Sequence, residues 1–472
     1  MTPVHEVELG TATLERFRSV LTDEQWQRLL RAAERGRKDF EGRVIWNVNS
    51  TARGGGVAEL LASLVPYSRA AGVDVRWLVI DGDPAFFQIT KRLHNMLHGA
   101  PGDGQGLSEP DRTVYRATSE RNAAELVELV GPDDLVLLHD PQTAGLIEPL
   151  RARGTRVVWR CHVGVDVPND LVRAAWAFLL PHVTAADRVV FSRAAFVWEG
   201  LDRSRVEVIP PSIDAFTPKN QPLAPGAIEA ILRASRMHAG PTDGVATFAR
   251  LDGTPGRVVR GVERNGSPPL PATAPAVVQV SRWDGLKDPR GVLRAYAESV
   301  APVTDAHLVL AGPDTAAVAD DPEGPAVLAE ITAYAERLSP ELRARVHLFS
   351  LPMDDLQENA IMVNALQRRA DVVVQKSLAE GFGLTVAEAM WKARPVVASA
   401  VGGVQDQIVD GESGLLVDPE DLDGFARAVT GLLADPGRAE WMGHNARERV
   451  RGAFLGARHL EQYVELFEGI VS

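Results

Sequence analysis

The sequence predicts an α/β protein with two doubly wound parallel sheets. Short runs of β-branched and aliphatic residues alternate with amphipathic helical stretches along most of the chain. The alternation forms two series, separated by a segment rich in Pro and Gly. The chain of 472 residues is also longer than one hydrophobic core usually holds. These observations favour two Rossmann-like domains over a single larger one.

The first series follows a charged helical prologue at residues 1–40. Two runs, "RVIWNVNS" and "VDVRWLVI", have the composition of buried strands. Between them, "VAELLASLVPYSRAAG" spaces its apolar residues at three and four, as a helix does. The series continues through "DLVLLHD", "TRVVWRCHV", "DRVVFS" and "RVEVIPP". We therefore expect an N-terminal Rossmann-like domain over residues 1–217 that includes the prologue.

The second series begins with "AVVQVSRWD" and continues through "HLVLAGP", "RVHLFSL", "DVVVQKS", "RPVVASA" and "SGLLVDP". It predicts a C-terminal Rossmann-like domain at 275–455. Residues 218–274 concentrate Pro and Gly, as a linker or a surface insertion does. We expect residues 456–472 to form a helix that packs back on the N-terminal domain. Since open α/β sheets bind ligands at the carboxyl ends of their strands, we also expect a central cleft between the domains.

Composition narrows the class of protein. The formal net charge of −13 and the pI near 5.4 give no basic footprint, which argues against nucleic-acid and anionic-membrane partners. The N-terminus lacks the apolar core of a signal peptide, and no run of eighteen uncharged apolar residues occurs. Cys161 is the single cysteine, so the chain can form no intrachain disulfide and no cysteine-built zinc site. We expect a soluble, cytoplasmic enzyme.

A run of three glycines follows the first predicted strand in "NSTARGGGVAEL". Gly54, Gly55 and Gly56 remove every Cβ at the start of a helix, so backbone N–H groups can approach an anion there. The alternative is a tight strand-to-helix turn, which needs about one glycine. The run lacks the lysine of a P-loop and the spacing of G-x-G-x-x-G. It therefore predicts an anion site without naming the ligand.

Two cations follow the first strand of the second series, in "SRWDGLKDP". Arg282 offers a planar fork of donors and Lys287 a mobile point charge, a pair suited to a diphosphate. Two solvated cations in a loop are the alternative. Their position at the carboxyl end of a predicted strand favours the diphosphate site.

Two glutamates frame a glycine-rich turn in "KSLAEGFGLTVAEAMWKARPVV". Glu380 precedes the predicted helix, and Glu388 lies about one turn inside it. Carboxylates accept two hydrogen bonds in a geometry that suits vicinal hydroxyls, so one could bind a sugar and the other a ribose. The alternatives are a capping role for Glu380 and a solvated helix position for Glu388.

Polar residues also end two strands of the first series. "WRCHVGVDVPND" places His162 at a strand end, where a purely structural histidine is an equal alternative. "LLHDPQTAG" offers His139, Asp140 and Gln142, which could hold the hydroxyls of an acceptor. A helix cap formed by Asp140 before Pro141 is an equal alternative to acceptor binding.

Taken together, these motifs resemble a known family. "EGFGLTVAEA" resembles the motif of two glutamates separated by seven residues in retaining GT-B glycosyltransferases, and "SRWDGLKDP" resembles their Arg and Lys diphosphate clamp. With "VNSTARGGGVAEL", "LLHDPQTAG", "WRCHVGVD" and "IPPSID", the chain is similar to the trehalose glycosyltransferring synthases and the closely related GT-B trehalose phosphorylases. The resemblance spans about residues 43–419 and is weakest around 220–270.

The resemblance implies a GT-B fold and a retaining glucosyltransferase. Such an enzyme moves glucose from a nucleoside-diphosphate glucose, UDP- or ADP-glucose, to free glucose and forms α,α-trehalose reversibly. It implies no cofactor and no metal, only small sugar and nucleotide-sugar substrates, and a homodimer would fit. The alternatives are a trehalose phosphorylase that uses inorganic phosphate, a GT-B enzyme with another acceptor, and a catalytically silent sensor of sugar nucleotides.

The resemblance assigns donor binding to the C-terminal domain and implies catalytic roles for three of its residues. Arg282 and Lys287 would hold the diphosphate and stabilise it as a leaving group. Glu380 would bind hydroxyls of the donor sugar, and Glu388 those of the ribose. The remaining donor contacts would be Gly381, Phe382, Gly383, Leu384 and Thr385.

The same resemblance implies a smaller set of residues in the N-terminal domain. His162, the fourth catalytic residue, would contact the donor glucose near its anomeric centre. Gly55 and Gly56 would lie over the diphosphate and the acceptor. Asp140 and Gln142 would contribute to the acceptor pocket.

Overall fold

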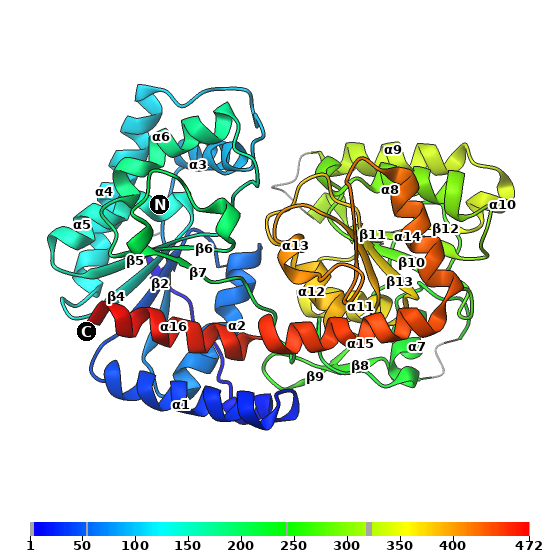
Figure 1. The fold of residues 1–472 in the computed structure, drawn as a ribbon, viewed down its shortest axis with the longest axis horizontal. Helices are drawn as coiled ribbons and strands as arrows, with labels where there is room; N and C mark the ends of the chain where they lie inside the picture. Colours follow the sequence, from blue (N-terminus) through cyan, green and yellow to red (C-terminus); the bar gives the residue numbers. More distant parts are fainter. Residues whose placement is uncertain (1–3, 53–54, 242–243, 318–322, 472) are drawn as a thin grey trace. The chain divides into compact units, whose positions relative to one another are not determined.

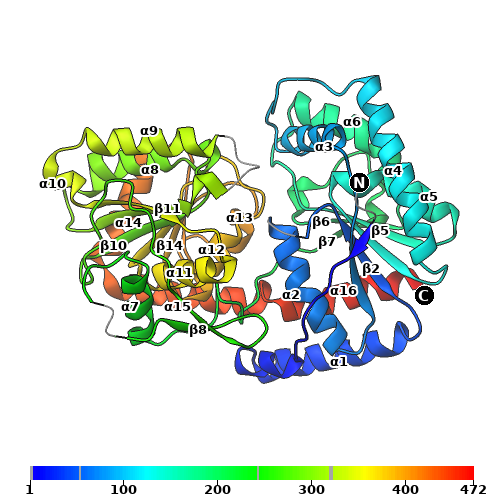
Figure 2. The same cartoon turned by 180° about the vertical axis from the view of Figure 1, so that it is seen from behind.

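The computed structural model describes residues 4–52, 55–241, 244–317 and 323–471. The chain divides into two compact units, Met1–Ile213 with Phe454–Ser472 and Asp214–Ala453. Each unit has its own parallel sheet with helices packed on it, as Figure 1 and Figure 2 show from opposite sides. No helix in the described ranges is long and apolar enough to cross a membrane.

The described part of the first unit forms a seven-stranded sheet in the order β1–β3–β2–β4–β5–β6–β7. All neighbours pair in parallel except β1, which adds to the edge antiparallel. The strand order reverses between β2 and β4, so the carboxyl ends of these two strands form a topological switch point. The strands are β1 (His5–Glu6), β2 (Ile45–Asn49), β3 (Val75–Val79), β4 (Leu135–His139), β5 (Arg156–Cys161), β6 (Arg188–Phe191) and β7 (Val206–Val208).

Both faces of this sheet are buried. On β4, Leu135 and Leu137 belong to one hydrophobic core, and Val136 and Leu138 belong to the other. Because neither face meets water, the strands are almost continuously aliphatic instead of alternating. This explains why they stand out as apolar runs in the sequence.

The last helix of the chain packs on the first unit. In Figure 1 α16, in red, runs beside α1, in blue, and Arg35 Nε lies 2.8 Å from Glu468 Oε1 between them. The capping box of Thr22 with Gln25 begins α1. The helices of this unit are α1 (Asp23–Asp39), α2 (Gly56–Ala70), α3 (Pro84–Leu97), α4 (Glu109–Leu129), α5 (Ile147–Ala152), α6 (Asp170–Val183) and α16 (Gly456–Val471).

The main sheet in the described part of the second unit has six parallel strands in the order β12–β11–β10–β13–β14–β15. Its order reverses between β10 and β13, which form a second switch point. The strands are β10 (Ala276–Val280), β11 (His307–Pro313), β12 (Val346–Leu351), β13 (Val372–Gln375), β14 (Val396–Ser399) and β15 (Leu415–Val417).

Helices cover this sheet as well, with α8 and α14 packed together and α12 packed on α15. The helices of the second unit are α7 (Pro225–Ala234), α8 (Pro289–Ala295), α9 (Gly324–Glu336), α10 (Pro340–Arg343), α11 (Leu356–Arg369), α12 (Leu384–Trp391), α13 (Val404–Gln407), α14 (Leu422–Ala434) and α15 (Pro436–Ala453).

Residues 214–274 are part of the second unit. The segment contains α7, which packs on α11, and a hairpin of β8 (Thr247–Ala249) with β9 (Pro255–Arg257). The buried Asn364 donates hydrogen bonds of 2.9 Å to the carbonyls of Pro218 and Gln221. The segment is thus a packed layer on this unit, whereas we had considered a linker or a surface insertion at 218–274.

The unit boundaries fall a few residues before those we expected at 217 and 455. The helix expected at 456–472 corresponds to α16 in the first unit, and α15 precedes it in the second. Between them, the Ile213 amide donates to the Phe454 carbonyl at 2.8 Å, and the Gly456 amide donates to the Ile213 carbonyl at 3.2 Å. These two backbone hydrogen bonds, which pair Ile213 with the segment just before α16, therefore fix where α16 begins.

Candidate active site

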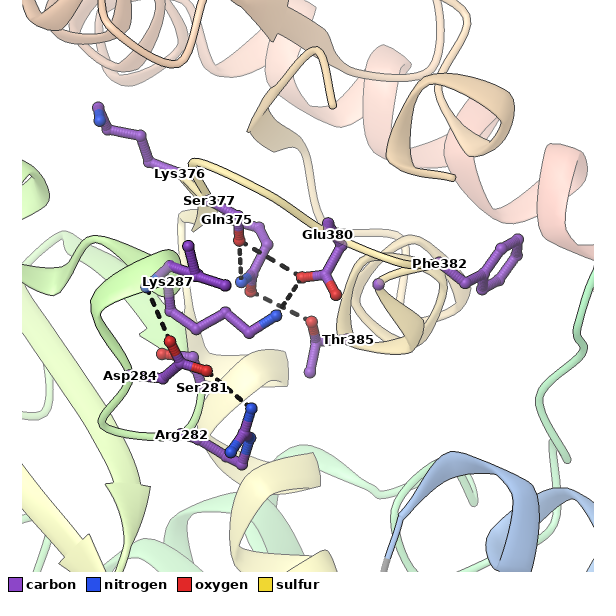
Figure 3. A network of polar contacts seen from close by, with 12 residues as sticks. Ser281, Arg282, Asp284, Lys287, Gln375, Lys376, Ser377, Glu380, Phe382 and Thr385 are labelled. Atoms are coloured by element: carbon purple, nitrogen blue, oxygen red, sulfur yellow. Dashed lines mark hydrogen bonds and ion pairs between the residues drawn. The ribbon is translucent and has the colours of Figure 1, made fainter. Parts of the chain in front are cut away.

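A partly buried ion pair joins the ends of two adjacent strands in the second unit. Lys287 Nζ lies 2.6 Å from Glu380 Oε2, and the two side chains are 16% and 11% exposed. Lys287 follows β10 and Glu380 follows β13, the strands at the switch point. Figure 3 shows the lysine side chain extending toward the carboxylate. The structure thus brings together two of the predicted catalytic residues where open α/β sheets bind ligands.

A second ion pair holds the same two loops. Asp288 is in the left-handed conformation (φ 45°), and one carboxylate oxygen accepts a 2.9 Å hydrogen bond from the Gly291 amide at the start of α8. The other oxygen pairs with the ammonium of Lys376, which is only 1% exposed. The loop after β10 thus supplies the cation of one pair and the anion of the other, and the loop after β13 supplies their partners. These crossed ion pairs fix the position of the Lys287 backbone.

Gln279, buried in β10, adds a neutral connection. Its Nε2 donates to the Lys287 carbonyl at 3.0 Å, and its Oε1 accepts from the Lys376 amide at 3.3 Å. The Leu378 amide also donates to the Leu286 carbonyl at 2.7 Å. The two loops are therefore held by backbone hydrogen bonds as well as by charge.

Arg282 occupies a different position from Lys287. Its side chain is 52% exposed, and its Nη2 lies 2.7 Å from Asp284 Oδ2. The other oxygen of Asp284 accepts from the Leu286 amide at 2.7 Å, which shapes the short turn Gly285–Lys287. In Figure 3 the guanidinium lies beside Asp284 rather than beside Glu380. The alternative considered for these residues was two solvated cations in a loop. Arg282 is exposed enough to fit that alternative, whereas Lys287 is not.

The turn after Glu380 is shaped by its glycines. Gly383 has φ 79° and is the N-cap of α12, which begins at Leu384. No side chain caps this helix, so the capping role considered for Glu380 is wrong. The Gly403 amide donates to the Gly381 carbonyl at 2.7 Å, which holds the turn against the loop before α13.

The rest of the turn packs closely on its neighbours. Phe382 is buried, and its carbonyl accepts a hydrogen bond from Gln407 Nε2. Thr385 Oγ1 donates to Gln375 Oε1 at 3.1 Å, which ties the first turn of α12 to the end of β13. A Cβ at Gly402 would stand 1.7 Å from the Glu380 carbonyl oxygen. This turn therefore has a single arrangement that larger residues would break.

Glu388 is buried within α12. Its residue is 3% exposed, so the solvated position considered for it is wrong. Lys219 Nζ lies 3.6 Å from its Oε1. Lys392 Nζ donates to the Glu388 carbonyl and to Asn220 Oδ1, both at 3.0 Å, and burial lowers the pKa of this lysine. This carboxylate is therefore buried beside cations, as buried charges in proteins are, and does not lie on a solvated helix face.

The glycine run lies at the switch point of the first unit. Gly55 has φ 80° and is the N-cap of α2, which begins at Gly56. A Cβ at Gly55 would meet nothing within 4 Å, so the requirement there is the backbone conformation. Gly54 lies outside the described residues. The anion site expected at this helix start stays a prediction.

His162 follows β5 and makes a hydrogen-bonded pair with His139, the last residue of β4. His139 Nδ1 lies 3.0 Å from His162 Nε2, and His139 Nε2 lies 3.1 Å from Asn47 Oδ1. Burial together with the nearby Arg160 guanidinium lowers the pKa of His139 to about 3 and that of His162 well below its usual range. Both rings are therefore neutral near pH 7.

Asp140 has an unusual backbone for a residue other than glycine, with φ 64° and ψ 175°. Its Oδ1 accepts from the His162 amide at 2.8 Å. It is the N-cap residue of the short 3-10 helix Pro141–Leu146, as the capping alternative placed it, but its side chain makes no capping hydrogen bond. Burial raises the pKa of its carboxyl to about 7. Strain of this kind is typical of functional sites.

Gln142, the other predicted acceptor residue, lies in the same 3-10 helix. Its Oε1 is buried and has no hydrogen-bond partner within the described ranges. A buried amide oxygen without a partner costs stability, so it is a candidate for a ligand hydrogen bond.

Sequence reasoning missed three polar residues that hold these sites. Asn47 is one of two buried amides in "IWNVN", Gln279 is the single amide in "AVVQV", and Lys376 follows "DVVVQ". All three are buried beside the switch points of their sheets. Polar residues are costly in strands buried on both faces, and this was the signal available in the sequence.

Comparison with known proteins decides the family. The model described as "Trehalose synthase, N-terminal domain" matches residues 47–198, and the model described as "Glycosyl transferases group 1" matches residues 263–449. A trehalose synthase of Pyrococcus horikoshii is 35% identical over 470 residues, which cover 100% of this chain and 99% of that protein. The chain belongs to the trehalose synthase family. The resemblance inferred from the motifs is thereby confirmed, and the chain is a glycosyltransferase.

More distant relatives agree with this family and its fold. A trehalose phosphorylase of Pleurotus pulmonarius is 26% identical over 466 residues, 93% of this chain but 58% of that protein. The structure of a sucrose-phosphate synthase from Thermosynechococcus elongatus aligns with a TM-score of 0.63 at 20% identity, over 90% of this chain and 98% of that one. The predicted fold class, GT-B with two Rossmann-like doubly wound domains, is confirmed.

Proposed function

We propose that this member of the trehalose synthase family transfers glucose from a nucleoside-diphosphate glucose to free glucose, with retention, and forms α,α-trehalose reversibly. The observation that carries the proposal is the partly buried Lys287–Glu380 pair at the switch point, with the buried Glu388 on the helix that follows. UDP- and ADP-glucose are the donors proposed. The family relationship supports the sugar chemistry, and the site supports a donor that carries a diphosphate.

Charge stabilisation of the leaving group is the main catalytic effect in this proposal. Lys287 carries an ammonium held by Glu380 at the carboxyl ends of the strands. Arg282, five residues before it, carries an accessible guanidinium. Preorganised cations lower the energy of charge that develops as the glycosidic bond breaks. No metal ion or other cofactor enters the proposal, because the two cations carry that role.

The glutamates serve as hydroxyl binders. Glu380 accepts from Lys287 through one oxygen, and its turn presents the amides of Gly381, Phe382 and Gly383. Carboxylates accept hydrogen bonds from vicinal hydroxyls, so Glu380 would bind the donor sugar and Glu388 the ribose. Leu384 and Thr385 complete this donor-binding stretch. The pair does not act as the acid and base of a glycoside hydrolase.

Residues of the first unit complete the proposal. His162 contacts the donor glucose near the anomeric centre, and Gly55 and Gly56 offer amides to the diphosphate and the acceptor. Asp140 and Gln142 bind acceptor hydroxyls, a role that suits the buried oxygen of Gln142.

The proposed step balances without a protein nucleophile. The bond between the anomeric carbon and the diphosphate oxygen breaks, and a bond from that carbon to the acceptor oxygen forms on the same face. The acceptor hydroxyl proton passes to the departing diphosphate oxygen. The products are the disaccharide and the nucleoside diphosphate.

A trehalose phosphorylase is the second candidate. The 26% identity to such an enzyme over 93% of this chain favours it, although the chain spans only 58% of that protein. Inorganic phosphate would replace the nucleoside diphosphate as the group bound by the cations. An acceptor other than glucose is a variant of the main proposal, and a silent sensor is opposed by the enzyme family found.

A donor and acceptor screen of the purified protein tests the proposal. UDP- and ADP-glucose are each incubated with glucose and with other sugars, and products are identified by chromatography and NMR. The expected product is α,α-trehalose. A product formed only from another acceptor would replace glucose as the proposed acceptor, and no transfer to any sugar would contradict the proposal. A homodimer and a cytoplasmic location belong to the same proposal, and light scattering checks the first.

A further inference from the structure

Three polar side chains form a row across the central strands of the first unit. Asn47 lies on β2, His139 ends β4, and His162 follows β5. The row consists of the 3.1 Å contact from Asn47 Oδ1 to His139 Nε2 and the 3.0 Å contact from His139 Nδ1 to His162 Nε2. The two imidazole planes differ by only 22°. This near-coplanar arrangement suits a hydrogen bond between ring nitrogens.

Burial, together with the charge of Arg160, keeps both imidazoles neutral. Arg160 is buried between them and α16, where its guanidinium donates to His459 Nε2 and to the Ile209 carbonyl, both at 2.8 Å. This cation, together with burial, opposes protonation of either ring. The acid nearest to the row is Asp140, and its Oδ1 contacts the His162 backbone amide.

Neutral imidazoles impose a direction on the row. A neutral histidine has one donor nitrogen and one acceptor nitrogen. Since Asn47 offers its carbonyl oxygen, His139 must carry its proton on Nε2, and its Nδ1 must accept. His162 must then carry its proton on Nε2, and its Nδ1 is left as an acceptor.

We propose that Asn47, acting through His139, sets the tautomer of His162, so that His162 presents an acceptor nitrogen to the substrate. Asn47 and His139 are positioning residues and do not touch the substrate. His162 Nδ1 makes no hydrogen bond to any described residue. An acceptor nitrogen selects a hydroxyl, which can donate, over an ether or carbonyl oxygen, which cannot. The identity of that hydroxyl as one of the donor sugar rests on the proposed function.

The position of Asn47 supports a role beyond packing. It lies in an aliphatic strand and is only 5% exposed, and it lines an apolar cavity with Leu137 and Phe467. An aliphatic residue would fill this place at lower cost than a buried amide. The hydrogen bond to His139 offsets the cost of burying this amide. His139 in turn contacts the half-buried ring of His162.

Histidine tautomers can be read directly by NMR. The full-length protein with ¹⁵N-labelled histidines is examined at about pH 8 by long-range ¹H–¹⁵N correlation, which separates Nδ1–H from Nε2–H rings. Spectra of His139→Gln and His162→Gln assign the two signals. The proposal predicts Nε2–H for both rings in the unmodified protein. An Nδ1–H signal for His162 would overturn it.

Two substitutions of Asn47 form a matched pair. Asn47→Asp keeps an acceptor oxygen, so His162 should retain the Nε2–H signal. Asn47→Leu has a similar volume without an acceptor, so His162 should shift to an average of both tautomers. An unchanged His162 signal in Asn47→Leu would overturn the proposal. If Asn47→Leu does not fold, the unmodified and Asn47→Asp spectra decide the question alone.

Activity gives an independent measurement. In the transfer assay, Asn47→Leu should lower kcat about tenfold, the scale of one hydrogen bond, with a smaller change in KM, and Asn47→Asp should lose less. Equal losses in the two variants would count against a tautomer effect. Absence of transfer in the unmodified protein would contradict the proposed function and leave the NMR result standing.

Discussion

Lys287 Nζ and Glu380 Oε2 lie 2.6 Å apart at the carboxyl ends of β10 and β13. The two residues are 93 positions apart in the chain, and the parallel pairing of their strands brings them together. The carboxylate holds the long lysine side chain in one conformation. Less side-chain entropy is then lost when the ammonium binds an anion. The pair is preorganised for charge stabilisation.

Replacing Lys287 by alanine should lower turnover at least about a hundredfold, because a charged contact to the leaving group is lost. Glu388→Ala should have an effect of the same size through loss of the ribose contact. The measurement is kcat/KM in the transfer assay. Arg290→Ala is the matched control, since this arginine is 64% exposed on α8. Near-normal turnover in Lys287→Ala and Glu388→Ala would rule out the proposed site.

Replacing Lys376 by methionine should destabilise the second unit by about 3 kcal/mol, the scale of breaking a buried ion pair. The buried ammonium pairs with Asp288, and its loss leaves that carboxylate without its cation. Calorimetric melting temperatures of Lys376→Met, Asp288→Asn and the double variant test this pairing. The double variant should lose less than the sum of the single variants. Strictly additive losses would show that the pair is not coupled.

A single methyl group at Gly402 should disrupt the donor turn. Its Cβ would stand 1.7 Å from the Glu380 carbonyl oxygen, and the residue has φ 47°. We expect Gly402→Ala to lower the melting temperature and to abolish binding of the nucleoside diphosphate in calorimetric titration. Gly431→Ala is the control, because a Cβ at this exposed position in α14 meets nothing within 4 Å. Unaltered binding in Gly402→Ala would show that the turn can rearrange.

Most of the fold could be predicted from the sequence because the strands are buried on both faces. Runs such as "HLVLAGP" and "DVVVQKS" match β11 and β13, since strands without a wet face are continuously aliphatic. The helix expected from residue 456 matches α16, which begins at Gly456, but the Ile213 backbone pairing just before it was missed, because it is a tertiary contact. The packing of residues 214–274 on α11 was missed for the same reason.

The site was predictable where it followed strand ends. Lys287 and Glu380 were inferred from motifs at the ends of predicted strands, and strand order brings them together. The ion pair of Asp288 with Lys376 joins residues 88 positions apart and has no periodic signal in one sequence. The row from Asn47 to His162 could not be predicted from one sequence either. Which atom donates and which accepts in it depends on tertiary contacts between individual side-chain atoms.

His139 should make the protein sensitive to acid. Burial lowers its pKa from 6.5 to about 3, so between these values the unfolded chain binds a proton that the folded chain does not. The stability it contributes is complete above about pH 6.5 and falls as the pH drops toward 3, by up to ~1.4 kcal/mol per pH unit. His139→Gln should make the slope shallower by this contribution, while the buried His162 still adds its own. Unfolding free energies of both proteins from pH 4 to 7 measure the difference, and parallel curves would contradict it.

The reverse reaction tests the central claim most directly. The purified protein is incubated with trehalose and either a nucleoside diphosphate or inorganic phosphate, and the products are separated by anion-exchange chromatography. The proposed transfer predicts nucleoside-diphosphate glucose and free glucose with the nucleoside diphosphate, and no reaction with phosphate. Glucose 1-phosphate formed from trehalose and phosphate would contradict the account and identify the chain as a phosphorylase.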